Sequence, residues 1–208
     1  MEKPKINVKS HKIEEYNYYH TKHKKNQIIL AGSLRKEDYH IKRLKKKEYG
    51  KTKKWNTFTI NRNGKIYQHF DPKCYSDFMG DKEVDKHSIS IVLENMGFVF
   101  YDYDTSKFLN WAHEICEEEF VYEKSWKNYL YWERYTDEQF DSTSRLCEYL
   151  CETYKIPLDS LGFNVQHADT PKFKGIVTRS NFSVDYTDLN PSFNFKQFLR
   201  SLNIDINE

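Results

Sequence analysis

The distribution of apolar and polar residues predicts several short strands. Residues 26–33 (NQIILAGS) and 88–94 (SISIVLE) are short apolar runs rich in β-branched residues, which is typical of buried strands. Residues 55–70 contain two alternating segments on either side of Asn63-Gly64. Because Asn-Gly readily adopts the positive φ angles of a tight turn, these two segments are expected to form a β-hairpin.

Further segments carry weaker strand and helix patterns. Residues 98–103 follow a turn and are expected to extend the same sheet, and residues 162–166 (GFNVQ) read as a strand that leads to His167. Residues 108–127 mix aromatic and acidic residues and are expected to be helical, as are the basic residues 34–49.

Residues 136–154 form the strongest predicted helix. Apolar side chains recur there at spacings that place them on one face. Thr136 and Gln139 are spaced as a capping box at its start, and Ile156-Pro157 marks its end. A short terminal helix is expected after Phe193.

Strands and helices alternate along the chain, which predicts an α/β fold with a mixed central β-sheet flanked by helices. The chain has 208 residues, enough for one domain with a substantial core. We expect a polar N-terminal arm over residues 1–25 and one domain over residues 26–208.

The composition indicates that aromatic residues contribute much of the core. Hydrophobic residues make up 38% of the chain and aromatic residues 16%, so large rings are expected to supply much of the buried surface. The net charge of +2 indicates no class of partner. Residues 42–54 are strongly basic; a solvated face is the favoured interpretation and binding of nucleic acid or another anionic polymer the less favoured one. Aromatic residues between 126 and 135 are interpreted as packing, with a sugar-stacking platform as the alternative.

The four cysteines include no CxxC pair and are expected to be buried free thiols. The first residues contain no apolar stretch of the kind found in secretory signals, and no apolar run is long enough for a membrane span. We therefore expect synthesis in the cytoplasm.

His167 and Asp188 are the candidate chemical groups. Each stands beside the end of a predicted element, so an imidazole and a carboxylate could supply two ligands to one zinc ion. A core histidine and a turn aspartate are the alternative interpretation.

Four motifs in order resemble the type-2 N-acetylmuramoyl-L-alanine amidases, whose fold is shared with peptidoglycan recognition proteins. Residues 61–68 (NRNGKIYQ) resemble the family's hairpin, residues 88–95 (SISIVLEN) its central strand, and residues 135–139 (YTDEQ) the start of its main helix. Residues 166–169 (QHAD) and 188–195 (DLNPSFNF) together resemble its terminal motif. The resemblance covers about residues 26–200.

The resemblance implies a zinc-dependent hydrolase that cuts the amide bond between N-acetylmuramic acid and L-alanine in peptidoglycan. It assigns His167 and Asp188 as metal ligands, and Ser33, Asn56 and Asp169 as substrate contacts. The family's first ligand follows its first strand as H-H-T, where this chain reads Ala31-Gly32-Ser33.

The acid and base positions also differ from the family pattern. The glutamate of one branch falls at Val92, with Glu94 two residues further on. The tyrosine and lysine of another branch fall at Asn56 and Tyr186. Glu94 and Tyr186 are therefore the candidate catalytic residues, and the third zinc ligand is unidentified. Substitutes for it are sought among the remaining histidines: His20, His23, His40, His69 and His87.

Three functions follow from the resemblance. The first is a divergent amidase of phage type, which reaches the cell wall once it is released. The second is a module that binds muropeptide without cutting it, and the third is a structural or accessory phage protein. A metal-free site is the alternative to a zinc site.

Overall fold

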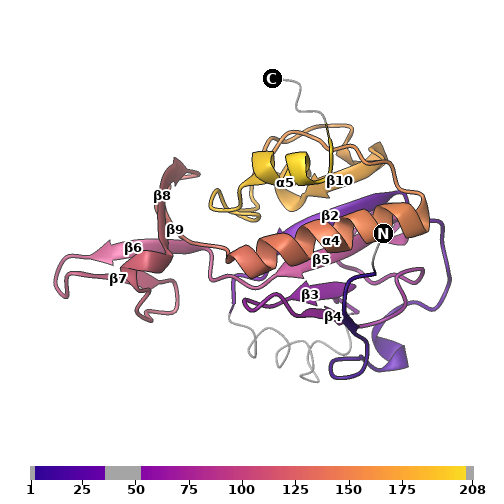
Figure 1. Ribbon diagram of the computed structural model, residues 1–208, viewed down its shortest axis with the longest axis horizontal. Coiled ribbons are helices and arrows are strands. Elements are labelled where there is room, and N and C mark those ends of the chain that lie inside the picture. Colours follow the sequence, from indigo (N-terminus) through magenta and orange to yellow (C-terminus); the bar gives the residue numbers. More distant parts are fainter. Residues whose placement is uncertain (1–2, 36–52, 205–208) are drawn as a thin grey trace.

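Two β-sheets organise the chain in the computed structural model, which describes residues 3–35 and 53–204. The larger, six-stranded sheet has the order β1-β4-β3-β5-β2-β10 (Figure 1). Its strands are β1 (Ile6–Asn7), β2 (Gln27–Gly32), β3 (Phe58–Ile60), β4 (Ile66–Gln68), β5 (Ser88–Leu93) and β10 (Gly175–Thr178). The other is a four-stranded sheet of order β7-β6-β9-β8, formed by β6 (Phe98–Asp102), β7 (Lys107–Asn110), β8 (Val121–Trp126) and β9 (Tyr129–Glu133).

The centre of the larger sheet is parallel. β2 lies between β5 and β10 and pairs with both in parallel, and every residue of these three strands is buried. Such strands carry apolar side chains on both faces, which is why residues 26–33 and 88–94 read as continuous apolar runs. The structure confirms both predicted strands.

The predicted hairpin is also confirmed. β3 and β4 pair antiparallel, and Gly64 in the turn between them has a φ of 75°. A side chain there would meet the carbonyl oxygen of Glu138 at 2.7 Å, so both the turn and the helix behind it require glycine.

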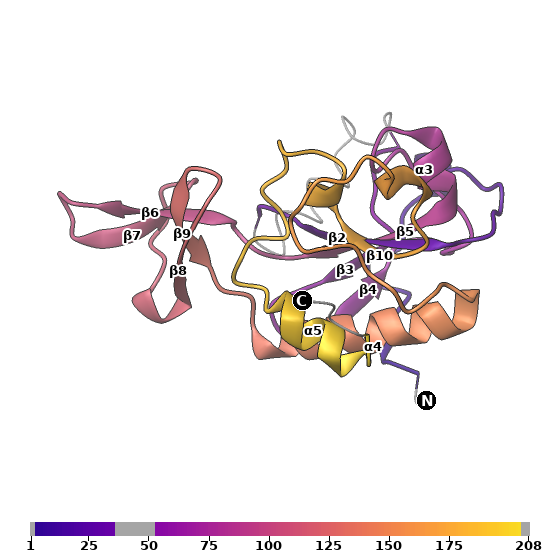
Figure 2. The same ribbon diagram turned by 90° about the horizontal axis from the view of Figure 1, so that it is seen from above.

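Helices cover both faces of the larger sheet (Figure 2). Helices α4 (Asp137–Tyr154) and α5 (Phe195–Ser201) lie on one side, and α3 (Lys82–His87) lies on the other. Alternate residues of β2 point to opposite faces of the sheet. Ile28 and Leu30 pack in the main core with α4 and α5, whereas Ile29 packs in a smaller cluster with Val84 of α3. The mixed α/β fold is thus the predicted one.

Helix α4 agrees closely with its prediction. The Thr136 hydroxyl accepts a hydrogen bond from the Gln139 backbone N–H, and the Gln139 side-chain Oε1 accepts one from the Thr136 backbone N–H, which completes the capping box. Lys155 ends the helix in the left-handed conformation.

The four-stranded sheet corrects two predictions. The strand predicted at residues 98–103 forms as β6 (Phe98–Asp102), but it pairs with β7 and β9 and belongs to the separate sheet, which projects from the body of the molecule (Figure 1). Residues 108–127 are not helical, apart from a single 3-10 turn, η2 (Glu118–Phe120), and they contain the end of β7 and all of β8. The sequence VYEKSW of β8 has three consecutive polar residues and no alternation of polarity, so its pairing with β9, and not a local pattern, makes it a strand.

A third correction concerns residues 162–166, which form turns and no strand. The strand of this region is β10, which comes after His167 and not before it. The terminal helix is confirmed as α5.

The N-terminal residues pack onto the domain. β1 pairs in parallel with β4, and after a 3-10 turn η1 (Glu15–Asn17) the chain buries Tyr18 against Phe70. The four cysteines are buried and free, as expected. Among the residues that the structure describes, no helix is long and apolar enough to cross a membrane. The predicted helix over residues 34–49 and most of the basic stretch 42–54 fall outside the described residues.

Candidate active site

The candidate site lies where β2 and β10 end side by side. The two strands run in parallel, and Leu30 is the partner of Thr178 in their register. The next residue after β10 is Arg179, which opens the 3-10 helix η4 (Arg179–Asn181). The Asn181 side chain fixes this turn, because its Oδ1 accepts a hydrogen bond from the Thr178 backbone N–H at 2.7 Å. The carboxyl ends of neighbouring parallel strands are a common position for binding sites in α/β proteins.

Arg179 and Asp188 form a bidentate ion pair at this edge. Arg179 Nε lies 2.8 Å from Asp188 Oδ2, and Nη2 lies 2.9 Å from Oδ1. The Gly32 backbone N–H at the end of β2 donates to Asp188 Oδ2 at 3.0 Å. Asp188 is 1% exposed, so this carboxylate is held by charge-assisted hydrogen bonds in a site with little water. One ion pair thus joins the end of β2, the end of β10 and the C-terminal loop.

Aromatic rings surround the guanidinium. Arg179 Cζ lies 4.6 Å from the ring centre of Tyr186 and 5.5 Å from that of Phe78. Burial disfavours the charge on Arg179, but the adjacent Asp188 carboxylate outweighs it and raises the pKa of the guanidinium. Arg179 therefore stays charged at any accessible pH.

Tyr135 also lies close to the Asp188 carboxylate, next to Gly32. Burial raises the pKa of Tyr135 well above its usual range, and the Asp188 charge adds to this effect. A side chain at Gly32 would come within 2.8 Å of the Tyr135 hydroxyl and 3.2 Å of Asp188 Cβ. Glycine at position 32 thus permits the tyrosine and the aspartate to approach the end of β2.

His167 makes no contact with this arrangement that the structure records. It lies in the loop before the 3-10 helix η3 (Thr170–Lys172), where its backbone N–H donates to the Asn181 carbonyl at 3.0 Å. Its ring atom Nε2 is shielded from solvent and has no hydrogen-bond partner among the described residues. The Asp188 carboxylate oxygens accept hydrogen bonds from Arg179 and from the Gly32 backbone N–H instead.

The positions that the resemblance assigns to the first ligand and to one branch's glutamate are apolar. Ala31 on β2 and Val92 on β5 are paired in register, and they are 0% and 3% exposed. They lie side by side on the sheet, close to the edge where Arg179 and Asp188 meet. No ligand or acid–base group can come from either of them.

The remaining predicted site residues are scattered. Glu94 is fully buried just beyond β5, and its carbonyl accepts a hydrogen bond from Gln139 at 2.8 Å. Asn56 is buried, and its side chain donates to the carbonyl of Phe58. The Ser33 hydroxyl donates to a neighbouring backbone carbonyl, Asp169 is exposed beside η3, and Tyr186 lies under the guanidinium.

The histidines considered as substitute ligands have other contacts. His69 is buried with its ring nitrogens 2.8 Å from the Thr59 hydroxyl and 2.8 Å from the His11 carbonyl. The rings of His23 and His87 lie 5.8 Å apart on the edge opposite the candidate site, near the start of β5. His20 contacts the Glu15 carbonyl, and His40 falls outside the described residues.

These donors do not fit a catalytic zinc ion. Such a site uses three protein ligands and one open position. Within residues 3–35 and 53–204, no three His, Cys, Asp or Glu side chains are grouped so that they could hold a metal. The best-placed donor, Asp188, already carries a guanidinium on both oxygens.

Arg179 is the residue that sequence reasoning missed. It directly follows the apolar run GIVT, and Asp188 comes nine residues later. The apolar run at residues 175–178 is the strand signal that precedes Arg179, whereas the predicted strand at residues 162–166 points to His167.

Comparison with known proteins identifies the class. A family model described as N-acetylmuramoyl-L-alanine amidase matches residues 9–180, so the chain belongs to this amidase family. The matched segment contains β2, β5 and Arg179, and it stops before Asp188.

Solved structures share the fold at low sequence identity. The N-acetylmuramoyl-L-alanine amidase LysC from Clostridium intestinale URNW is 16% identical with a TM-score of 0.53, and the match covers 97% of this chain and 99% of that one. The endolysin amidase LysCS from the same organism is also 16% identical, with a TM-score of 0.55 and coverages of 98% and 99%. AmpDh3 from Pseudomonas aeruginosa, in complex with anhydromuramic pentapeptide, is 12% identical with a TM-score of 0.52 and coverages of 96% and 66%. A search of curated proteins found no matching sequence.

Proposed function

We propose that this protein recognises peptidoglycan and holds a muropeptide without hydrolysing it by the zinc-dependent route of its family. Membership of the amidase family and the shared fold support the choice of ligand. The proposed loss of hydrolysis rests on the bidentate Arg179–Asp188 pair, because Arg179 occupies the carboxylate that the resemblance assigns to the metal.

Electrostatics explains why the two cations exclude each other. A zinc ion bound to Asp188 would have to displace Arg179 from a carboxylate that is 1% exposed, or share it with a second positive charge. The displaced guanidinium would lose its hydrogen bonds inside the protein, which is costly for a charged group. Ala31 and Val92 offer no compensating ligand.

Hydrolysis by zinc is the second candidate function, favoured by family membership alone. In that case Zn²⁺ would supply an activated water and polarise the scissile carbonyl. His167 and Asp188 would be its protein ligands, with a third group from outside the described residues and with Arg179 moved away. Glu94 and Tyr186 would then be the acid–base candidates.

Sacculus binding and amide hydrolysis measured on one preparation distinguish the two functions. Purified peptidoglycan sacculi are incubated with the full chain, with and without added zinc. The bound fraction is measured by sedimentation, and hydrolysis is measured by the appearance of free L-alanine amino groups. We expect sedimentation with the sacculi and no new amino groups, with LysC as the positive control for hydrolysis.

Zinc-dependent release of amino groups that is lost in Asp188→Asn would overturn the proposal in favour of the amidase. Failure to sediment with sacculi, with or without zinc, would overturn peptidoglycan recognition itself. Contact with the cell wall would require release from the cell in which the protein is made, as for the endolysin that it resembles.

A further inference from the structure

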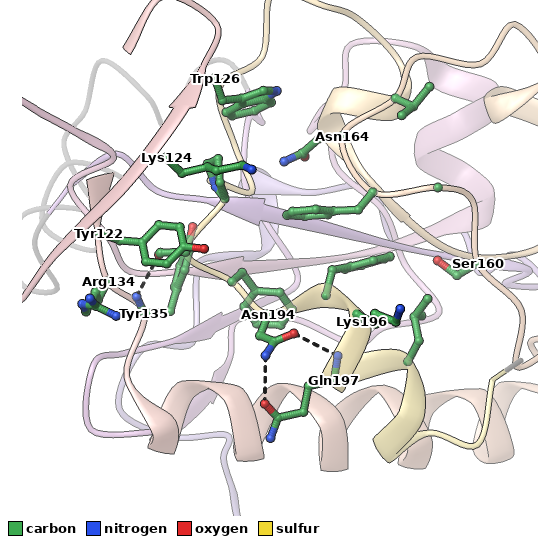
Figure 3. Close-up of a pocket in the computed structure, with 18 of the residues that line it drawn as sticks. Tyr122, Lys124, Trp126, Arg134, Tyr135, Ser160, Asn164, Asn194, Lys196 and Gln197 are labelled. Carbon is green, nitrogen blue, oxygen red and sulfur yellow. Dashed lines mark hydrogen bonds between the residues drawn. The ribbon is translucent and has the colours of Figure 1, made fainter. Parts of the chain in front are cut away.

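The projecting sheet has one face turned toward the body of the molecule and one turned away from it. Tyr122 and Lys124 of β8 line the cavity of about 1050 Å³ between this sheet and α5, so their side of the sheet faces the body (Figure 3). Glu123 lies between them in sequence and is the register partner of Tyr131 of β9. Because neighbouring residues of a strand point to opposite faces, Glu123 and Tyr131 belong to the other side, here called the outer face.

Four aromatic rings form a continuous row on the outer face. Tyr101 pairs in register with Phe108, and Val99, two residues before Tyr101, pairs with Tyr131, so these side chains share one side of the sheet. From Tyr103 through Tyr101 and Phe108 to Tyr131, neighbouring ring centres are 5.0 Å apart. Tyr103 is 86% exposed, and none of the four rings belongs to a hydrophobic cluster of the described residues. Exposed aromatic rows of this kind are typical of protein–protein interfaces.

The projecting sheet is acidic, although the chain as a whole is not. Residues 98–133 contain eight Asp or Glu and three Lys, which gives a net charge of −5 in a chain whose total is +2. Glu123 on the outer face and Asp104, next to Tyr103, are both exposed. The faces of tyrosine rings attract cations, and carboxylates pair with them. The outer face is therefore suited to a partner surface that carries lysine or arginine.

The first described residues form a surface of the opposite charge. Residues 3–12 (KPKINVKSHK) contain four Lys and no Asp or Glu, and all four lysines are exposed. They lie on both sides of β1, which is an edge strand of the six-stranded sheet. Val8, among them, is 50% exposed. Ammonium groups around a small apolar patch complement carboxylates around aromatic rings.

These two surfaces lie far apart in one molecule. The projection extends from one end, and the N-terminal residues lie toward the opposite end (Figure 2). We propose that they meet between two copies of this chain, so that the outer face of one copy binds residues 3–12 of the next. Such a contact joins two different surfaces and leaves one of each free, so further copies add head to tail. The proposed association goes beyond the proposed function and does not depend on it.

Sedimentation velocity of the full chain tests the proposed association. The average sedimentation coefficient should rise with protein concentration at about 0.05 M salt and stay constant at about 0.5 M, because salt screens charges at an exposed contact. Glu123→Lys with Tyr103→Ser, and separately Lys5→Glu with Lys9→Glu, should each weaken the association at least about tenfold. Glu152→Lys, at an exposed position of α4, is the matched control for a charge reversal and should leave it unchanged.

Mixing the two double variants distinguishes head-to-tail contact from other modes of association. Each variant keeps the surface that the other has lost, so an equimolar mixture should form a complex of one copy of each and grow no further. A mixture that stays monomeric, in variants with unchanged circular dichroism, would overturn the proposal. A sedimentation coefficient of the unmodified chain that does not change with concentration at low salt would also overturn it, as would association that both double variants retain.

Discussion

The Arg179–Asp188 pair shows how a single residue decides the chemistry of a site. Asp188 is kept at the position where the family resemblance expects a metal ligand, but its charge is balanced by a guanidinium from the end of β10. The guanidinium is a monovalent cation fixed by a side chain, and through it the pair links the ends of β2 and β10 with the C-terminal loop. Under the proposed function, the same pair keeps a divalent ion from this carboxylate.

Removing the guanidinium should destabilise the protein strongly. Arg179→Ala leaves Asp188 buried without its counter-ion, and breaking such a pair costs about 3 kcal/mol or more of unfolding free energy. The double variant Arg179→Met with Asp188→Leu should lose clearly less, because no unpaired charge remains. Urea unfolding followed by circular dichroism measures both. Equal losses in the two variants would mean that packing, and not charge, accounts for the effect.

Replacing the guanidinium by an imidazole should create zinc affinity. Arg179→His offers a nitrogen ligand next to Asp188, so zinc should bind at least about tenfold more tightly than to the unmodified chain, a difference of about 1.4 kcal/mol. Titration with zinc and metal analysis after gel filtration measure this, and Arg179→Gln is the matched control. Stoichiometric zinc in the unmodified chain would contradict the prediction.

At the scale of elements, the sequence was informative where one rule decides the structure. The Asn63-Gly64 turn, the capping box of α4 and the apolar runs of β2 and β5 each have a local cause, and the structure confirms all of them. β8 was missed because its sequence has no alternating pattern, and its strand conformation depends on pairing with β9. The assembly of Arg179, Asp188 and Gly32 depends on parallel pairing between β2 and β10, which no local pattern specifies.

Helix α3 carries a prediction about pH. Asp85 on this helix is 4% exposed; burial raises the pKa of its carboxyl to about 7, although the N–H groups of Met79 and Gly80 oppose this. Its pKa in the unfolded chain is about 3.9. Between these values the folded state holds a proton that the unfolded state has lost. The unfolding free energy should therefore fall as pH rises from about 4 to about 7, by an amount on the order of a few kcal/mol.

Asp85→Asn should remove most of that dependence, since the amide keeps one acceptor oxygen and carries no charge. Urea unfolding at a series of pH values between 4 and 8 measures the slope. The exposed Asp104→Asn is the control and should keep the slope of the unmodified protein. A slope that is unchanged in Asp85→Asn would show that another group titrates in this range.

At the scale of the whole molecule, the projecting sheet is an addition to a self-sufficient body. The hydrophobic clusters around the six-stranded sheet contain no residue between Gly97 and Arg134 in the described part of the chain. The two ends of the projection meet, because the Glu133 backbone N–H donates to the Gly97 carbonyl at 2.8 Å. The body and the projection therefore have separate hydrophobic cores, and polar contacts also join them, such as the hydrogen bonds from Lys127 Nζ to the Val184 carbonyl at 2.7 Å and from Trp111 Nε1 to the Leu34 carbonyl at 3.1 Å.

Excision of residues 98–132, with a short glycine linker from Gly97 to Glu133, should leave a folded protein. The core residues of the body keep their neighbours, and Glu133 keeps its ion pair with Arg62 at 3.1 Å. Cooperative thermal unfolding and a retained tertiary circular dichroism signal would show this. A variant that unfolds without cooperativity would mean that the sheet completes the core of the body.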